Sequence, residues 1–169
     1  DHPNNQSNGG IKMLHQEVAK LLNEQINKEF YSAYLYLDMA GYYAFENLNG
    51  FANWFNIQAQ EERDHALLFR TYLLNNDHSI DLTAIAAPGN DFKNFSEPLA
   101  LTLAHEQSVT ASIHNIYACA FKVQDFRTMQ FLDWFIKEQG EEEKNANDLI
   151  KKFELFGNDS KSLYLLDQE

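Results

Sequence analysis

Apolar residues recur every three or four positions along four long segments of the chain, which is the spacing that places side chains on one face of an α-helix. The four apolar stripes comprise Leu22, Ile26, Ala33, Tyr36 and Ala40; Phe51, Phe55, Phe69 and Tyr72; Leu99, Leu103, Ile113, Tyr117 and Ala120; and Leu132, Phe135, Ala146, Leu149 and Phe153. Glycine and proline fall mostly between these segments. The pattern predicts an all-α chain with four long helices.

The connections between the predicted helices indicate how the helices pair. Residues 46–49 and 124–125 are short connections, which predict two antiparallel hairpins. About 20 residues, 76–95, separate the hairpins, and at about 3.3 Å per residue they can reach along a whole bundle. Residues 160–167 are predicted to form a fifth helix, which is too short to be stable alone and therefore indicates contacts with other subunits. The expected fold is a four-helix bundle with a long crossover between helices 2 and 3 and a short fifth C-terminal helix.

Particular residues mark the ends of the predicted helices. Ser96 is expected to cap the N-terminus of the third helix, with Pro98 tolerated in its first turn. Gly157 is expected to end the fourth helix in the left-handed conformation.

The chain divides into a short polar segment and one domain. Residues 1–12 carry no apolar periodicity and are predicted to be either a disordered tail or a remnant of expression, and Met13 is a candidate for the native start. The chain has 169 residues, of which 44% are hydrophobic, enough for one compact core. Residues 13–169 are therefore expected to form a single four-helix bundle domain.

The net charge narrows the range of partners. A formal charge of −12 disfavours nucleic acid and anionic membranes, and it favours cations. No apolar run approaches the roughly 18 residues of a membrane span, and no segment resembles a secretory signal. Cys119 has no partner for an intrachain disulfide and is expected to be a small buried hydrophobe. These features predict a cytoplasmic protein.

Polar residues interrupt each apolar stripe at a place where a core residue is expected. The interruptions are Glu29 in the first helix, Glu62 and His65 in the second, Glu106 in the third, and Gln139 and Glu142 in the fourth. Each falls in the middle half of its helix, so all should lie at a common height in the bundle. Glu29 and Glu62, like Glu106 and Gln139, are separated by 33 positions, which indicates a duplicated helix pair.

Several carboxylates buried together require a counter charge. A single buried glutamate can pair with lysine or arginine or lie at an interface, and for any one of these residues that reading is the simpler one. Their coincidence on four helices instead favours a bound multivalent cation. A set of oxygens with one imidazole and no sulfur suits iron or manganese better than structural zinc. Glu62 and Glu106 are the natural candidates to bridge or flank two ions.

Short motifs around these residues resemble those of a known family. They are Asn23-Glu24-Gln25-Ile26-Asn27, Glu29, Tyr31 and Tyr36; Ala59-Gln60-Glu61-Glu62 with His65; and Glu138-Gln139 with Glu141-Glu142-Glu143-Lys144. The chain is similar to the bacterial non-haem ferritins over residues 13–169.

The resemblance implies a site and an activity. It implies a di-iron ferroxidase centre, at which O₂ or hydrogen peroxide oxidises Fe(II), with the catalytic residues Glu29, Tyr36, Glu62, His65, Glu106 and Gln139. Tyr36 would be a redox and hydrogen-bonding residue, and the other five would be metal ligands. A third iron site facing a cavity would comprise Glu61, Glu138, Glu141 and Glu142. Glu142 could serve either the di-iron pair or the third site. The resemblance also implies a hollow cage of 24 subunits that stores iron.

The chain departs from related patterns at two places. Relatives often have histidine where this chain has Gly140, and a glycine within a helix indicates local flexibility beside the third site. Bacterioferritins carry a methionine haem ligand directly after the first motif's glutamate, whereas Arg63 follows Glu62 here. Haem is therefore not expected.

Several aromatic and histidine residues have simpler readings. Tyr36 is as well explained by packing with a hydroxyl partner as by redox chemistry, and Trp134 is expected in the core rather than in an electron relay. His105 is adjacent to Glu106 but should point to a different helical face as a satisfied histidine.

Three functions fit these observations. We expect an iron-storage ferritin that oxidises Fe(II) and mineralises Fe(III). The first alternative is a non-storage di-iron oxidase or peroxidase of the same superfamily, but the Cys-x-x-Cys motifs of an electron-delivery domain are not found in this sequence. The second is a metal-free helical interaction module, which leaves the buried polar residues unexplained.

Overall fold

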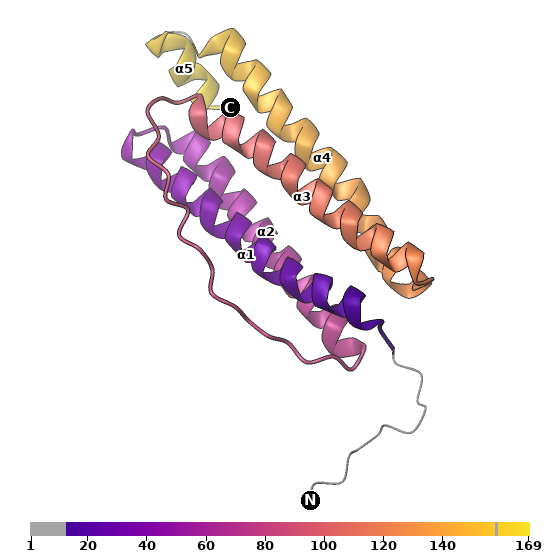
Figure 1. Cartoon of the computed structure of the whole chain (residues 1–169). Helices are drawn as coiled ribbons and strands as arrows, with labels where there is room; N and C mark the ends of the chain where they lie inside the picture. The colour runs from indigo at the N-terminus through magenta and orange to yellow at the C-terminus, as the bar shows by residue number, and fades with distance from the viewer. Residues whose placement is uncertain (1–12, 158) are drawn as a thin grey trace, which may run out of the picture.

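A computed structural model describes residues 13–157 and 159–169, so the prediction for residues 1–12 lies outside the described residues. The helices are α1 (Gln16–Phe45), α2 (Asn49–Asn75), α3 (Glu97–Lys122), α4 (Phe126–Phe156) and α5 (Ser160–Asp167). Figure 1 shows the first four as a long bundle, with α5 folded over one end. The predicted all-α fold of four long helices and a short fifth is confirmed. No helix in the described ranges is long and apolar enough to cross a membrane.

The helices pair as two hairpins, α1 with α2 and α3 with α4, and the long crossover between them is confirmed (Figure 1). Asn23 and Asn27 of α1 hold the crossover by its backbone. The Asn23 side chain donates to the carbonyl of Asp81 at 2.9 Å and accepts from its amide at 3.0 Å. The Asn27 side chain donates to the carbonyl of Ala84 at 2.9 Å. The crossover is therefore fixed along α1 rather than free in solvent.

α3 begins just after Ser96 and α4 ends just before Gly157, as predicted, but the predicted capping bond and left-handed conformation at these two residues are wrong. Ser96 makes no capping bond with its side chain; Asn94 Oδ1 instead accepts from the amides of Ser96, at 3.0 Å, and Glu97, at 3.1 Å. Gly157 has φ −89°, which is outside the left-handed region. Glycine is needed there for space, because a Cβ would lie 2.6 Å from the carbonyl oxygen of Phe153. Pro98 lies in the first turn of α3, as predicted.

The apolar core falls into two clusters, one toward each end of the bundle. Leu22, Phe69 and Ile113 belong to the cluster at the end where α1 begins. Tyr43 and Phe55 belong to the cluster at the opposite end, where their rings stack at 5.5 Å. Between the clusters lie the polar residues that interrupt the apolar stripes, all buried. The core is thus divided by a polar layer at mid-height.

The short helix α5 packs within its own chain. Leu163 and Leu166 join the cluster that contains Tyr43. Asp167 is buried, and its Oδ1 accepts from the backbone amide of Phe51 at 2.8 Å, in the first turn of α2. A Cβ on Gly50 would lie 1.6 Å from the carbonyl oxygen of Asp167, so only glycine allows this approach. The packing that so short a helix requires thus comes from its own chain, and contacts of α5 with other subunits stay a prediction.

Candidate metal centre

The polar layer brings the interrupting residues of four helices together. They are Glu29 of α1, Glu62 and His65 of α2, Glu106 of α3, and Gln139 and Glu142 of α4, each at most 4% exposed. Because each occupies a core position of an amphipathic helix, the same packing that buries the apolar stripe also buries its carboxylate or imidazole. The predicted common height is confirmed.

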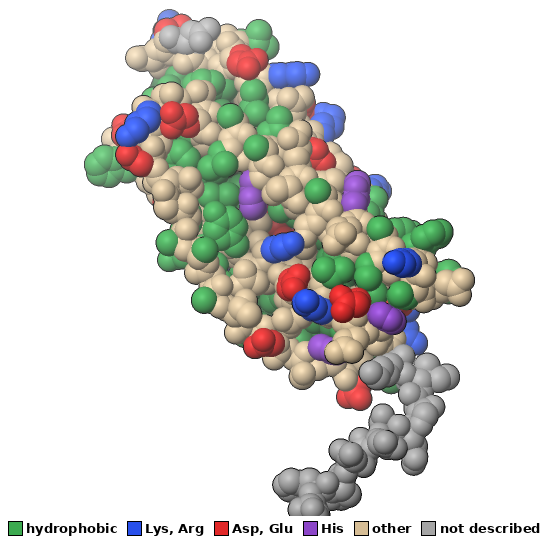
Figure 2. All heavy atoms as spheres, viewed as in Figure 1, with side chains coloured by type: hydrophobic (Ala, Val, Ile, Leu, Met, Phe, Trp, Pro, Cys, Tyr) green, Lys and Arg blue, Asp and Glu red, His purple; other side chains and the backbone are tan. Residues whose placement is uncertain are grey.

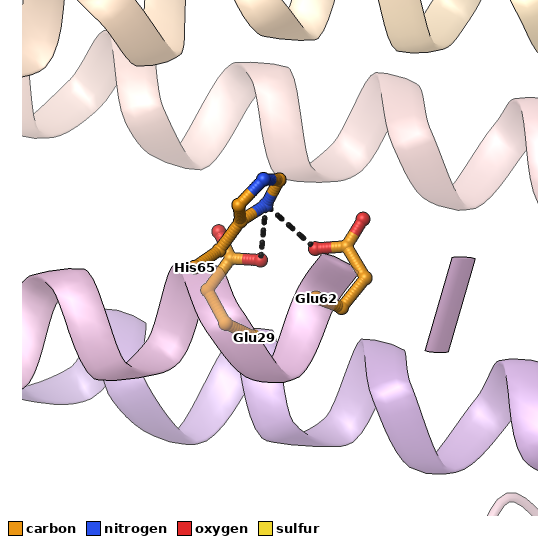
Figure 3. A group of neighbouring side chains, drawn as sticks. All are labelled: Glu29, Glu62 and His65. Atoms are coloured by element: carbon orange, nitrogen blue, oxygen red, sulfur yellow. Dashed lines mark hydrogen bonds and ion pairs between the residues drawn. The ribbon is translucent and has the colours of Figure 1, made fainter. Parts of the chain in front are cut away.

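Glu29, Glu62 and His65 form the first group of possible ligands. Figure 3 shows the two carboxylates and the imidazole facing one another across α1 and α2. His65 Nδ1 lies 3.2 Å from Glu62 Oε2 and 3.9 Å from Glu29 Oε2. Glu29 Oε2 and Glu62 Oε1 are buried without a hydrogen-bond partner. A buried oxygen without a hydrogen-bond partner is costly, and bound cations would satisfy these two oxygens.

Glu62, Glu106 and Glu142 form the second group. Each of these residues offers an oxygen within 4.8 Å of those of the other two, and the same limit holds for the ligand atoms of the first group. Glu62 belongs to both groups, whereas Glu106 belongs only to the second. The geometry therefore favours Glu62 as the carboxylate between two ions, and Glu106 as a residue that flanks one of them.

Donors from two neighbouring helices, α1 and α4, hold the Glu106 carboxylate. The Tyr36 hydroxyl donates to Glu106 Oε1. Gln139 Nε2 donates to Glu106 Oε2 and to Thr110 Oγ1, both at 3.1 Å. Thr110 in turn donates to Glu143 Oε2 at 2.8 Å. Neither Thr110 nor Glu143 was among the predicted site residues. Thr110 could have been found in the same way as Glu106, because it is a polar residue on the apolar stripe of α3.

The residues predicted for a third site lie beside the second group. Glu61 and Glu138 are half-buried, and Glu141 is exposed. The charges of Glu61 and Glu138 both act on the buried Glu142 carboxyl. Glu142 thus lies between the second group and the half-buried pair, which explains why the sequence could not assign it to one site.

Burial determines the protonation of these carboxyls. Loss of hydration raises the pKa of Glu29 and of Glu62 well above the usual range, and the charge of Glu62 raises the pKa of Glu29 further. Burial, followed by the charges of Glu106 and Glu61, raises the pKa of Glu142 to about 9. Burial and the charge of Glu106 also raise the pKa of the Tyr36 hydroxyl. Without a metal, the layer holds protons at neutral pH, which a cation would displace.

The metal-free protein should lose stability as the pH rises. Between the pKa of an unfolded glutamate, about 4.3, and the raised pKa of Glu142, about 9, the folded state holds a proton that the unfolded chain has released. The free energy of unfolding should therefore fall by up to about 1.4 kcal/mol per pH unit for each such carboxyl. Urea unfolding in the presence of a chelator at pH 6 and pH 8 measures this, and Glu142→Gln should reduce the decline. A stability that rises over this range would contradict the protonated layer.

Aromatic rings border the first group. Trp134 is 48% exposed, so its assignment to the core is wrong, yet its ring lies edge-on to the His65 ring with centroids 5.4 Å apart. His105 is half-buried, and its Nε2 lies 2.7 Å from Ser32 Oγ. Burial lowers the pKa of His105. This histidine is satisfied outside both groups, as predicted.

Comparison with known proteins identifies close likenesses. A family model described as the ferritin-like domain matches residues 19–156. The bacterial non-haem ferritins of Campylobacter jejuni and Staphylococcus saprophyticus are each 39% identical to this chain, covering 92% and 93% of it, and 93% and 94% of their own lengths. A crystal structure described as a novel open pore ferritin from the archaeon Archaeoglobus fulgidus matches with a TM-score of 0.90 and 36% identity, covering 94% of this chain and 96% of that one. The matched range includes every residue of the two buried groups.

Proposed function

Because the chain belongs to the bacterial non-haem ferritins, we propose that it stores iron, oxidising Fe(II) at the two buried groups and retaining Fe(III) as a mineral inside a hollow cage. The observation that carries the proposal is the position of Glu62, which is shared by two adjacent sets of ligand atoms. A shared carboxylate is what a pair of ions held a few ångströms apart requires. Fe(II) is the substrate, and no haem is part of the proposal.

In the proposed reaction, two Fe(II) ions bind as protons leave the layer. Glu29 and His65 hold one ion, Glu106 and Glu142 hold the other, and Glu62 lies between them. Two Fe(II) supply two electrons, which reduce O₂ to hydrogen peroxide with two protons, or hydrogen peroxide to two waters with two protons. Anionic oxygen ligands stabilise Fe(III) relative to Fe(II), so the ligand set favours the oxidised product.

Tyr36 and Gln139 have supporting roles in this proposal. Both donate hydrogen bonds to Glu106, one to each carboxylate oxygen. Gln139 therefore fixes a ligand, and its own Oε1 is left as the atom that it could offer to an ion. Tyr36 has the hydroxyl partner that simple packing predicts, and a redox role for it stays a proposal.

Assembly into a cage of 24 subunits is part of the proposal. Support comes from the ferritin relatives and from large hydrophobic side chains that a single chain leaves exposed, among them Leu37, Phe121 and Phe126. Such residues are usually covered in an assembly. Glu61, Glu138 and Glu141, with Glu142, are proposed as the third iron site on the way to the cavity. The proposed compartment is the cytoplasm, which the single cysteine suits.

Two measurements test the proposal. The first is the absorbance change after rapid mixing with two Fe(II) per chain in aerated buffer, and the second is the mass of the particle. We expect a fast oxidation phase that saturates near two Fe(II) per chain, and a particle of 24 chains that keeps further iron in solution. Fast oxidation by a monomer or dimer would instead indicate the non-storage di-iron enzyme. A chain that neither binds nor oxidises Fe(II) would contradict both functions.

A further inference from the structure

A chain of hydrogen bonds connects the outer surface to Glu29. Lys28 Nζ donates to Ser112 Oγ at 2.9 Å, and Ser112 Oγ donates to Gln25 Oε1 at 2.7 Å. Gln25 Nε2 donates to Glu29 Oε1 at 3.1 Å. Lys28 is exposed, Ser112 is half-buried, and Gln25 and Glu29 are buried, so the chain passes from solvent between α1 and α3 into the polar layer.

Hydrogen-bonding chemistry fixes the direction of this chain. The lysine ammonium has donors and no acceptor, so Ser112 must accept from Lys28. The single serine proton is then available for Gln25, which must present its carbonyl oxygen to Ser112. The amide nitrogen of Gln25 consequently faces Glu29. Without Ser112, the Gln25 amide could turn over and place an oxygen against the Glu29 carboxylate.

The hydrogen-bond chain reaches only one of the two carboxylate oxygens of Glu29. Oε1 accepts from Gln25, whereas Oε2 is buried, has no hydrogen-bond partner, and lies 3.9 Å from His65 Nδ1. Glu106, by contrast, has a donor on each oxygen. Glu29 is thus held from one side, with its other oxygen turned toward the imidazole.

We propose that Gln25 and Ser112 are positioning residues that orient Glu29, so that Oε2 faces the ion bound by His65. This inference rests on the proposed function. Lys28 sits at the solvent end, where water can replace it, so the two inner hydrogen bonds carry most of the effect. Outer partners that orient a metal ligand commonly change metal affinity by about 10-fold to 100-fold.

The solvent end of the hydrogen-bond chain, Lys28 and Ser112, lies at a surface cavity of about 370 Å³. It is lined by Asn27, Lys28, Tyr31, His105, Ser108, Val109 and Ser112. Figure 2 shows one face of the bundle, on which hydrophobic side chains lie between charged ones over both halves. Ser112 can therefore be changed without opening the apolar core.

Ser112→Ala tests the proposal, with Ser108→Ala as its control. Both serines are on α3 and line the same cavity, but Ser108 Oγ donates to the carbonyl of His105 in its own helix. Alanine is the strongest helix former, so both variants should fold. The readout is anaerobic Fe(II) titration followed by the fluorescence of Trp134, whose ring lies 5.4 Å from the His65 ring.

We expect Ser112→Ala to weaken binding of the ion beside His65 by about 10-fold, Ser108→Ala to leave it unchanged, and Ser112→Thr, which keeps the hydroxyl, to restore it. In a Glu29→Gln background, Ser112→Ala should have no further effect, which a general loss of stability would not reproduce. If the wild type binds Fe(II) and Ser112→Ala binds it as tightly as Ser108→Ala and the wild type do, the positioning role is wrong while the proposed function survives. If wild type binds no Fe(II), the proposed function itself fails.

Discussion

Replacing Glu62 with glutamine should slow the fast oxidation of Fe(II) by on the order of 100-fold, equivalent to about 2.7 kcal/mol of barrier. Glu62 is the residue shared by the two groups. Its loss should therefore weaken the binding of both ions and disturb their position relative to each other. Glutamine keeps the shape of the side chain and can offer only a neutral oxygen. The effect should exceed that of Glu29→Gln, which touches one group.

The same rapid-mixing experiment measures this loss. Glu24→Gln is the matched control, because Glu24 is exposed on α1 and its replacement makes the same change of charge. The metal-free Glu62 variant should be at least as stable as wild type, since it removes a buried carboxyl of raised pKa. Unchanged oxidation in a folded Glu62→Gln protein would exclude the bridging position.

Gly50→Ala should lower the stability of the chain by about 1 to 3 kcal/mol. Helix propensity alone would make alanine favourable by up to about 1 kcal/mol. The added Cβ, however, would meet the carbonyl oxygen of Asp167 at 1.6 Å, which forces α5 away from α2. Overpacking of this kind costs about 1–3 kcal/mol. Displacing Asp167 also removes its hydrogen bond to the Phe51 amide, which costs about 1 kcal/mol more.

Thermal unfolding measures the effect of Gly50→Ala, which corresponds to a fall in Tm of about 2–12 °C for a chain of this size. Gly41→Ala is the control, because Gly41 is also helical and a Cβ there meets nothing within 4 Å. That variant should gain about 0.5–1 kcal/mol from propensity alone. Equal gains at both positions would mean that α5 does not hold the start of α2.

The repeat of apolar positions was enough to predict the helices and their burial, because each helix packs one face and the pattern records that face directly. Glu29, Glu62 and Glu106 could be found for the same reason, as polar residues within an apolar stripe. What the pattern does not contain is the direction of a side chain. The donor role of Gln139 and the edge-on packing of Trp134 both depend on neighbours from another helix.

Contacts between distant segments were the other information that the sequence lacked. Ser96 has the chemistry of an N-cap, but its hydroxyl donates to Asn94 Oδ1 at 2.6 Å instead, and the same Asn94 oxygen accepts from the amides of Ser96 and Glu97. From the sequence, Asp167 looks like a surface residue at the end of a short helix. Its burial against the first turn of α2 depends on the path of α5, which no local pattern specifies.

The two hairpins have diverged at matching places, which gives the proposed pair of ions a direction. Glu62 of the first hairpin corresponds to Gln139 of the second, and His65 corresponds to Glu142. In the proposed pair, the ion beside Glu29 and His65 would have a neutral imidazole ligand, whereas the ion beside Glu106 and Glu142 would have carboxylates, with Gln139 as a neutral neighbour in the polar layer. A trivalent ion gains more from each anionic neighbour than a divalent one does. Under the proposed function, Glu106 and Glu142 should therefore hold the ferric product more tightly than Glu29 and His65 do, and the half-buried Glu61 of α2 and Glu138 of α4 add negative charge beside Glu142.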